Sequence, residues 1–148
     1  IAPSTQGAPR RAVIGWESGR LAMLLAVLET RCGLGLASSE VYLNIVGGLK
    51  ISEPAADLAV AASLISSITE KPAFSKTVIF GEIGLSGEIR TVSQISARLK
   101  EAEKLGFTRA IIPFEKKPEK KKSRYSGKIE INEIKDLKSF LSLLTEEP

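Results

Sequence analysis

Histidine is absent from this chain of 148 residues, and Cys32 is its single cysteine. Catalytic triads that use histidine as the base are therefore excluded, and one cysteine cannot close an internal disulfide. A metal site is not expected either, because zinc in proteins is held mainly by histidine and cysteine. We expect Cys32 to act as a small buried apolar residue, and the protein to reside in a reducing cytoplasm.

Long apolar runs are also missing. No stretch approaches the roughly 18 apolar residues of a membrane-spanning helix, and the sequence has no charged segment followed by an apolar leader. A hydrophobic content of 43% is nevertheless enough to build a core. These features predict one globular domain without a membrane partner.

Positive charge is concentrated in residues 114–128, which carry a net charge of +5 within a chain whose total is +4. Such a loop binds any polyanion through release of counterions, with little sequence preference. Charge runs of this kind are more often solvated loops, so DNA contact here is the less favoured of two interpretations. The candidate residues of this basic loop are Lys116, Lys117, Lys120, Lys121, Lys122 and Arg124.

Apolar spacing predicts strands and helices that alternate along the chain. Strands are expected at residues 10–16, 41–45, 77–83, 109–112 and 128–131. Helices are expected at residues 18–33, 54–68 and 93–106 and after residue 132, with caps at Ser18, Ser52, Ser93 and Asn132. This alternation indicates an α/β layered fold with a mixed β-sheet packed by helices. Residues 1–9 are typical of a linker, which leaves 10–148 as the domain.

Few motifs for chemistry are present. There is no phosphate-binding GxxxxGK[ST] motif, and Gly81, Gly84 and Gly87 have the wrong spacing for a dinucleotide site, so we interpret them as turn residues. The carboxylate pairs Glu53/Asp57 and Glu82/Glu88 could serve in acid–base chemistry, but their spacing is equally typical of solvated residues, which we favour. A serine activated by lysine remains the one nucleophilic arrangement that composition allows.

Two stretches of the sequence resemble a known family. They are VYLNIVGGLKISEPAADLAVAASLISS and VIFGEIGLSGEIRTVSQISARLKEAEKLGFTRAIIP. Both resemble the C-terminal domain of bacterial RadA recombination proteins, which is similar in fold to the proteolytic domain of Lon proteases. The resemblance runs from about Pro9 to Pro113. It implies a Lon-protease-like fold, with a zinc module and an ATPase domain, binding Zn and ATP with Mg, upstream of the linker at residues 1–9.

The resemblance also places the two catalytic positions of Lon proteases on this sequence. The nucleophilic serine corresponds to Ala55, and the catalytic lysine corresponds to Ser96. A methyl group cannot attack a carbonyl, and a hydroxyl does not replace an amine base. A degenerate dyad is therefore implied, and no catalytic residue is predicted. A dyad relocated to Lys100, one helical turn beyond Ser96, is kept as a disfavoured alternative.

Membership of the RadA family would imply work on DNA during recombination and branch migration. The expected partners are single-stranded or branched DNA, further copies of the chain in a hexameric ring, and a recombinase. Basic residues next to strand ends and glycine turns are the candidates for phosphate contact: Arg10, Arg11, Lys50, Arg90 and Arg98. Two other interpretations stay open, an active Ser/Lys peptidase and an oligomerisation module that never meets DNA.

Overall fold

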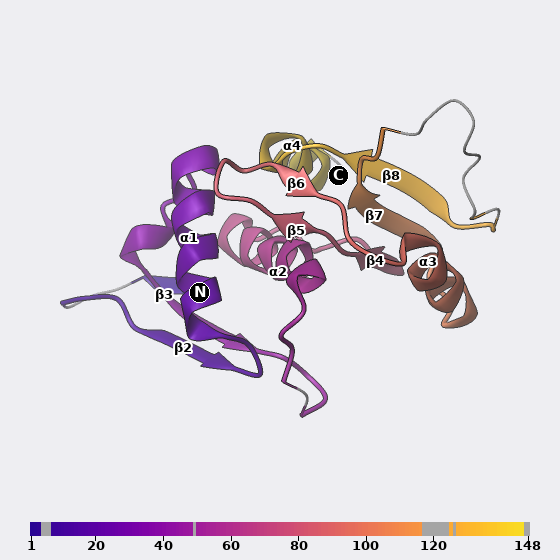
Figure 1. Cartoon of the computed structure of the whole chain (residues 1–148). Helices are drawn as coiled ribbons and strands as arrows, with labels where there is room; N and C mark the ends of the chain where they lie inside the picture. The colour runs from indigo at the N-terminus through magenta and orange to yellow at the C-terminus, as the bar shows by residue number, and fades with distance from the viewer. Residues whose placement is uncertain (4–6, 49, 117–124, 126, 147–148) are drawn as a thin grey trace.

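A computed structural model describes residues 1–3, 7–48, 50–116, 125 and 127–146 of the chain (Figure 1). Strands and helices alternate from one end to the other, and helices pack against the sheets. The predicted α/β layered class is thereby confirmed. The strands form separate small sheets rather than one continuous sheet.

The first sheet is mixed and has the strand order β1-β3-β2. Its strands are β1 (Ala2–Pro3), β2 (Arg11–Ile14) and β3 (Ser39–Asn44), and β1 runs antiparallel to β3 while β2 runs parallel to it. Helix α1 (Ser18–Cys32) and the short 3-10 helix η1 (Leu36–Ser38) connect β2 to β3. A helical crossover is the usual way to join two parallel neighbours. Strand β1 lies within residues 1–9, which the sequence predicted to be a linker, and it contributes two residues to this sheet.

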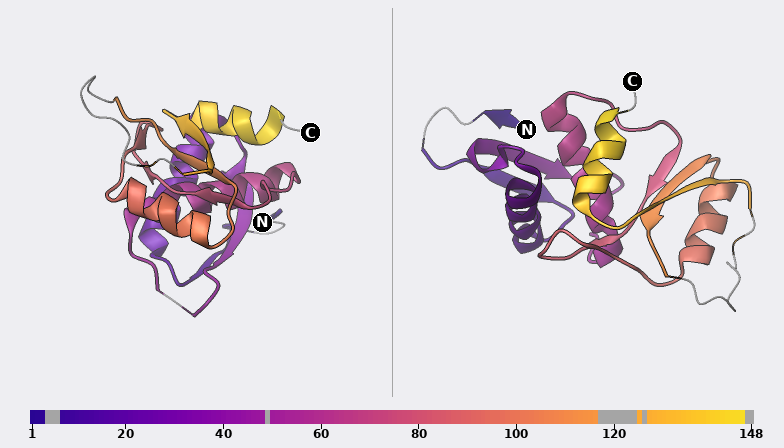
Figure 2. Two further views of the ribbon diagram at one scale, coloured as in Figure 1. Left: turned by 90° about the vertical axis from the view of Figure 1, so that its right-hand side faces the viewer. Right: turned by 90° about the horizontal axis from the view of Figure 1, so that it is seen from above.

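The second sheet is parallel and has the order β4-β7-β8. It comprises β4 (Thr77–Ile79), β7 (Arg109–Pro113) and β8 (Glu130–Ile134), and helix α3 (Ile95–Lys104) leads into β7. Between β4 and α3 lies an antiparallel pair, β5 (Glu82–Ile83) and β6 (Ile89–Arg90). The β2–β3 pair and the β7–β8 pair lie at opposite ends of the molecule (Figures 1 and 2).

The remaining elements are the short 3-10 helix η2 (Pro54–Ala56), helix α2 (Asp57–Thr69) and helix α4 (Leu137–Glu146). Helices α1, α2 and α4 contact one another and enclose the larger of two hydrophobic clusters. Its fully buried side chains include Leu24, Leu28, Leu58, Ile65 and Phe140. A smaller cluster joins α3 to the second sheet through Phe80, Leu99, Ala110 and Ile112.

The predicted start of the last helix is wrong. Asn132 lies in β8, where its Oδ1 accepts a hydrogen bond from Arg109 Nε at 2.7 Å, and α4 begins only at Leu137. The cap is instead Asp136, whose Oδ1 accepts the backbone N–H of Ser139 at 2.8 Å. Those N–H and hydroxyl groups of Ser139 lower the pKa of Asp136. Strand β8 ends at Ile134, whereas the sequence predicted that the strand would end at residue 131.

The other predicted caps and one predicted strand also differ from the structure. The starts of α1, η2 and α3 have no side-chain cap, so Ser18, Ser52 and Ser93 do not serve as caps. The strand expected at residues 77–83 is divided into β4 and β5, because the backbone at Gly81 bonds to a different segment, described below.

Candidate functional site

The segment around Ala55 is held through backbone atoms. Ala55 lies in η2, is 4% exposed, and its carbonyl accepts the N–H of Gly81 at 2.9 Å. The carbonyl of Gly81 in turn accepts the N–H of Leu58 at 3.0 Å. A Cβ at position 81 would lie 3.2–3.3 Å from Ile89, Pro113 and Leu58, so glycine permits this close approach. The residue at 55 offers only a methyl group.

Helix α3 lies against the same segment. Arg98 of α3 forms an ion pair with Glu53, and its guanidinium lies 5.6 Å from the centre of the Phe80 ring. The structure therefore brings together the two segments that carry Ala55 and Ser96. The Ser96 hydroxyl is shielded from solvent and has no hydrogen-bond partner among the described residues. No described residue therefore accepts a hydrogen bond from this hydroxyl as a general base would.

Lysine does not supply a base elsewhere in the described part of the chain. Every lysine there is exposed, including Lys100 on α3, so no amine is desolvated in the way that a catalytic lysine requires. Among these residues one lysine, Lys71, donates a hydrogen bond from its Nζ, and the acceptor is the carbonyl of Thr145. No serine hydroxyl in the described ranges is hydrogen-bonded to a lysine amine.

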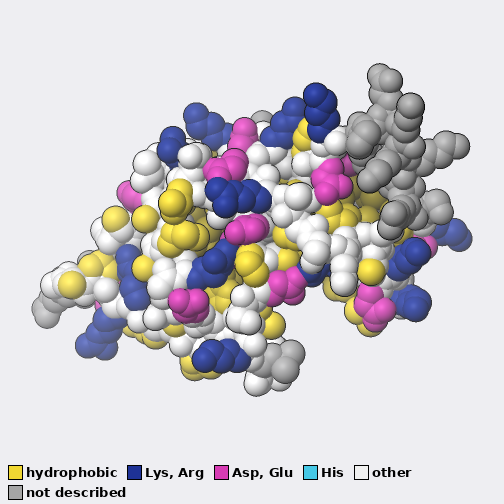
Figure 3. All heavy atoms as spheres, viewed as in Figure 1, with side chains coloured by type: hydrophobic (Ala, Val, Ile, Leu, Met, Phe, Trp, Pro, Cys, Tyr) yellow, Lys and Arg dark blue, Asp and Glu magenta, His cyan; other side chains and the backbone are white. Residues whose placement is uncertain are grey.

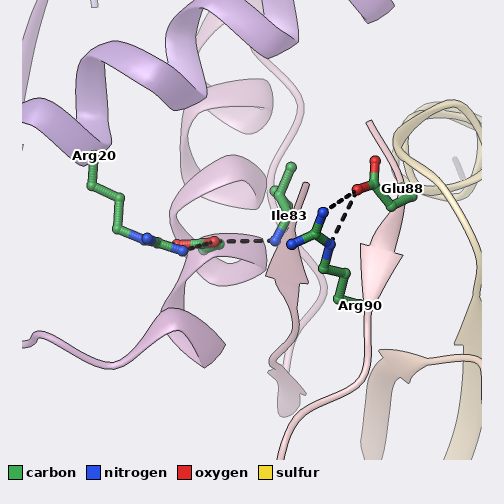
Figure 4. A network of polar contacts seen from close by, with 5 residues as sticks. Arg20, Ile83, Glu88 and Arg90 are labelled. Carbon is green, nitrogen blue, oxygen red and sulfur yellow. Dashed lines mark hydrogen bonds and ion pairs between the residues drawn. The ribbon is translucent and has the colours of Figure 1, made fainter. Parts of the chain in front are cut away.

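A buried ion pair adjoins the Ala55 segment. Asp57 is fully buried at the first residue of α2, and both of its carboxylate oxygens accept hydrogen bonds from Arg20 of α1 (Figure 4). Its Oδ2 also accepts the backbone N–H of Ile83 in β5 at 3.1 Å. The carboxylate raises the pKa of Arg20. The prediction of Asp57 as a solvated residue is wrong, since it joins α1, α2 and β5.

The other predicted carboxylate pair behaves differently. Glu88 is half-buried and accepts two hydrogen bonds from Arg90, at 2.9 and 3.1 Å, and one from the backbone N–H of Ser86 at 3.0 Å. Hydrogen bonding by its own backbone, followed by Arg90, lowers the pKa of Glu88. Gly87, with φ of 82°, and Gly84 share a backbone bond beneath it, which agrees with their interpretation as turn residues.

The five predicted phosphate contacts differ in what their side chains already bind. Arg10 and Lys50 are exposed and have no hydrogen bond or ion pair from their side chains within the described residues. Arg90 is paired with Glu88, and Arg98 is paired with Glu53. Arg11 donates to the carbonyls of η1 and Ser39, with Nη2 3.0 Å from the Leu36 oxygen. On the face shown in Figure 3, basic and acidic side chains are interleaved.

The predicted basic loop lies almost entirely outside the described residues. Lys116 is described and exposed. The other candidates lie outside the described residues: Lys117, Lys120, Lys121, Lys122 and Arg124.

Two features escaped the reasoning from sequence. The sequence does not indicate that Arg20 forms an ion pair, because its partner Asp57 is 37 residues away. Tyr42 lies on the solvent side of β3 with 56% of its surface exposed. The alternation of Val41, Leu43 and Ile45 already indicated that Tyr42 points away from the core.

Cys32, expected to be a small buried residue, is half-buried against the core rather than fully buried. Burial raises the pKa of its thiol.

About two thirds of the chain matches a known family. The family model described as subunit ChlI of Mg-chelatase matches residues 18–116, and the chain belongs to this family. That range includes α1, the Ala55 segment, the Arg20–Asp57 pair and α3. The matched range therefore contains the elements around Ala55, whereas Arg10 and Arg11 lie outside it.

Among curated proteins, the chain is homologous to DNA repair proteins named RadA. It is 58% identical to RadA of Brucella abortus over 113 residues, which are 76% of this chain and 24% of that protein. It is 60% identical to RadA of Rickettsia bellii over 111 residues, 75% of this chain and 25% of that protein. RadA of Rickettsia conorii is 49% identical over 142 residues, 95% of this chain and 31% of that protein. The chain thus spans about a quarter to a third of these relatives.

Two other kinds of feature are absent from the described part of the chain. In the described ranges, no helix has both the length and the apolar character needed to cross a membrane. The same ranges contain no cluster of three or more acidic, cysteine or histidine side chains able to hold a metal ion.

Proposed function

We propose that this chain is a non-proteolytic, Lon-protease-like domain of a RadA-type DNA repair ATPase, placed C-terminal to the ATPase domain. In this proposal the domain supports assembly of a hexameric ring and contacts DNA during branch migration. The observation that carries it is identity of 49–60% to RadA proteins over three quarters or more of the chain. That identity favours the DNA repair assignment over one taken from the Mg-chelatase name of the family model.

The absence of peptidase chemistry is part of this proposal. Ala55 has no nucleophile, Ser96 has no base, and the described lysines, Lys100 included, are exposed. Incubation of the purified chain with an unfolded protein such as casein should release no peptides above the background of a mock purification. Hydrolysis that persists through repeated purification, and that an Ala55→Gly variant retains, would reveal another nucleophile and contradict this part of the proposal.

DNA contact is assigned first to Arg10 and Lys50, because their side chains are free of partners in the described part of the chain. Arg11, Arg90 and Arg98 would have to exchange existing hydrogen bonds for phosphate. The double variant Arg10→Glu/Lys50→Glu should weaken binding of labelled DNA by at least tenfold at low salt, since two phosphate contacts become repulsive. Lys100→Glu/Lys138→Glu, an equal change of charge at exposed helix positions, is the matched control.

Ring assembly is tested separately from DNA binding. Light scattering of the chain at increasing concentration should detect masses above that of one chain, and the Arg10→Glu/Lys50→Glu variant should assemble equally well. If the chain assembles but no variant changes DNA binding, it is an oligomerisation module without DNA contact. Weak binding by single chains is expected to strengthen on assembly, because linked sites act together.

The remaining parts of the proposal concern the protein around this chain. ATP with Mg would be bound by the ATPase domain and Zn by the zinc module, both upstream. A recombinase would be a partner on the shared DNA, and the location would be cytoplasmic. Deletion of residues 10–148 from the RadA-type protein should leave ATP hydrolysis measurable while reducing its assembly into rings, which mass photometry would record.

A further inference from the structure

One face of the first sheet is open to solvent. Side chains alternate across a strand, and Val13 on β2 and Val41 on β3 face the core cluster that α1 completes. The opposite side of the sheet, here called the outer face, is formed by Arg10, Ala12, Ile14, Glu40, Tyr42, Asn44 and Val46. The exposed fractions of Ile14, Tyr42 and Val46 are 68%, 56% and 86%.

Tyr42 is presented on this face in a way that suits stacking. Its cross-strand neighbour in the β2–β3 register is Ala12, whose methyl group is too small to cover the ring. The Tyr42 hydroxyl donates a hydrogen bond to Glu40 Oε2 at 2.9 Å, which fixes the direction of the side chain. The ring is therefore held in place while much of its surface stays accessible.

Basic residues lie near both ends of β2, which forms one edge of the outer face. Arg10 precedes β2, and its charge is close enough to Tyr42 to oppose the rise in pKa that Glu40 causes there. Lys50 lies in the loop that leaves β3, next to Ile51, whose N–H bonds to Gly15 just after β2 (Figure 1). The four residues of β2 span about 13 Å, at about 3.3 Å each, which is the length of a few stacked nucleotides at about 3.4 Å each.

We infer that the outer face binds single-stranded DNA, with an unpaired base stacked on Tyr42 and the flanking phosphates held by Arg10 and Lys50. This inference rests on the proposed function and adds to it the surface that binds, the choice of single-stranded over branched DNA, and the stacking residue. An exposed aromatic ring flanked by basic side chains is the arrangement that single-strand binding uses. Paired bases do not offer their faces to such a ring, so the site discriminates against duplex.

The charges on this face favour DNA over a second copy of the chain as the occupant. The two cations are not neutralised by any described side chain, and a second copy would bring the same cations to the interface. Glu40 is the one carboxylate on the outer face, and it opposes a phosphate backbone while holding the Tyr42 hydroxyl. Removal of the Glu40 charge therefore provides a second test, in which DNA binding should become stronger rather than weaker.

The experiment measures fluorescence anisotropy of a labelled 15-nucleotide oligothymidine and of a matched duplex with the complete 148-residue chain at low salt. Tyr42→Ala should weaken single-strand binding about tenfold and leave duplex binding unchanged, whereas Tyr42→Phe, which keeps the ring, should bind like the wild type. Leu105→Ala, which truncates another exposed apolar side chain, is the control. Glu40→Gln should strengthen binding about twofold. Circular dichroism checks that each variant folds.

The outcomes separate the inference from the function on which it rests. If the wild type binds DNA and Arg10→Glu/Lys50→Glu weakens it, but Tyr42→Ala does not, the stacking site is overturned and the proposed DNA contact stands. If the wild type binds neither probe even at submillimolar concentration, both fall. If Tyr42→Ala instead lowers the mass measured by light scattering, the face binds a second copy and the inference is wrong.

Discussion

Two arginine–carboxylate pairs lie within one small region of the molecule and differ in almost every physical respect (Figure 4). Arg20 and Asp57 come from separate helices, and the Asp57 side chain is 1% exposed. Arg90 and Glu88 are two residues apart on one strand and its turn, and their side chains are 56% and 40% exposed. The same kind of ion pair thus joins distant segments in one place and lies on the surface of a turn in the other.

Burial decides what each pair contributes. Removal of one member of a buried pair leaves a charge without its partner and without water, which costs about 3–5 kcal/mol. Exposed pairs contribute much less, because water and salt already solvate both charges. We therefore expect substitutions at the Arg20–Asp57 pair to reduce the free energy of unfolding, and substitutions at the Arg90–Glu88 pair to change it little.

The largest effect is expected for Arg20→Met. This change leaves the buried Asp57 carboxylate with only the Ile83 N–H and the start of α2 for compensation, and should lower the free energy of unfolding by about 3 kcal/mol. Urea denaturation would measure the loss. Arg31→Met, on the same helix and exposed, is the control, and a loss below about 1 kcal/mol at Arg20 would contradict the assignment.

Asp57→Asn should cost less, about 2 kcal/mol, because the amide oxygen can still accept the Ile83 N–H and the Arg20 side chain, 24% exposed, can reach water. The double variant Arg20→Met/Asp57→Asn should be more stable than the sum of the two single losses predicts. Strict additivity in the same urea measurement would mean that the two residues do not act as a pair.

Asp136→Ala should cost about 1 kcal/mol, since it removes the cap of α4. The pKa of Asp136 is lowered in the folded state, so its contribution to stability is present above the unfolded pKa of about 3.9 and is lost as pH falls through the folded pKa. Wild type and variant should therefore differ in stability at pH 6 and converge as the pH falls through the folded pKa of Asp136. A constant difference across that range would rule out the charged cap.

The smallest effect is expected for Glu88→Gln. The pair with Arg90 is solvated, and glutamine can still accept the N–H of Ser86. The melting temperature at pH 7 should stay within experimental error of the wild type, and should respond to added salt in the same way. A decrease as large as that of Asp136→Ala would show that the comparison between exposed and buried pairs is wrong for this region.

The sequence predicted the fold where the signals were local. Leucine spacing in residues 21–28 indicated α1, and alternation at 41–45 indicated β3, because each element repeats its own period. It did not predict that β4 and β5 would separate, since that break depends on Gly81 meeting Ala55 across 26 residues. Asn132 was assigned to a helix because a capping residue and the end of an alternating strand look alike without the neighbouring β7.

The candidate site was likewise only partly predictable from the sequence. The sequence gives the identity of the residues at 55 and 96, whereas the exposure of every lysine in the described ranges is known only from the structure. Arg10 and Arg11 are adjacent and chemically identical, yet Arg11 donates to carbonyls of residues 36 and 39 and Arg10 does not. Only the alternation of the strand, combined with the fold of η1 against it, distinguishes one from the other.

The backbone bonds between Ala55, Gly81 and Leu58 have an evolutionary consequence. Because the bond between Ala55 and Gly81 uses main-chain atoms, it does not depend on which side chain occupies position 55. A lineage could thus lose or exchange that side chain and keep the scaffold intact, so that a surface elsewhere on the domain became free to acquire a different use.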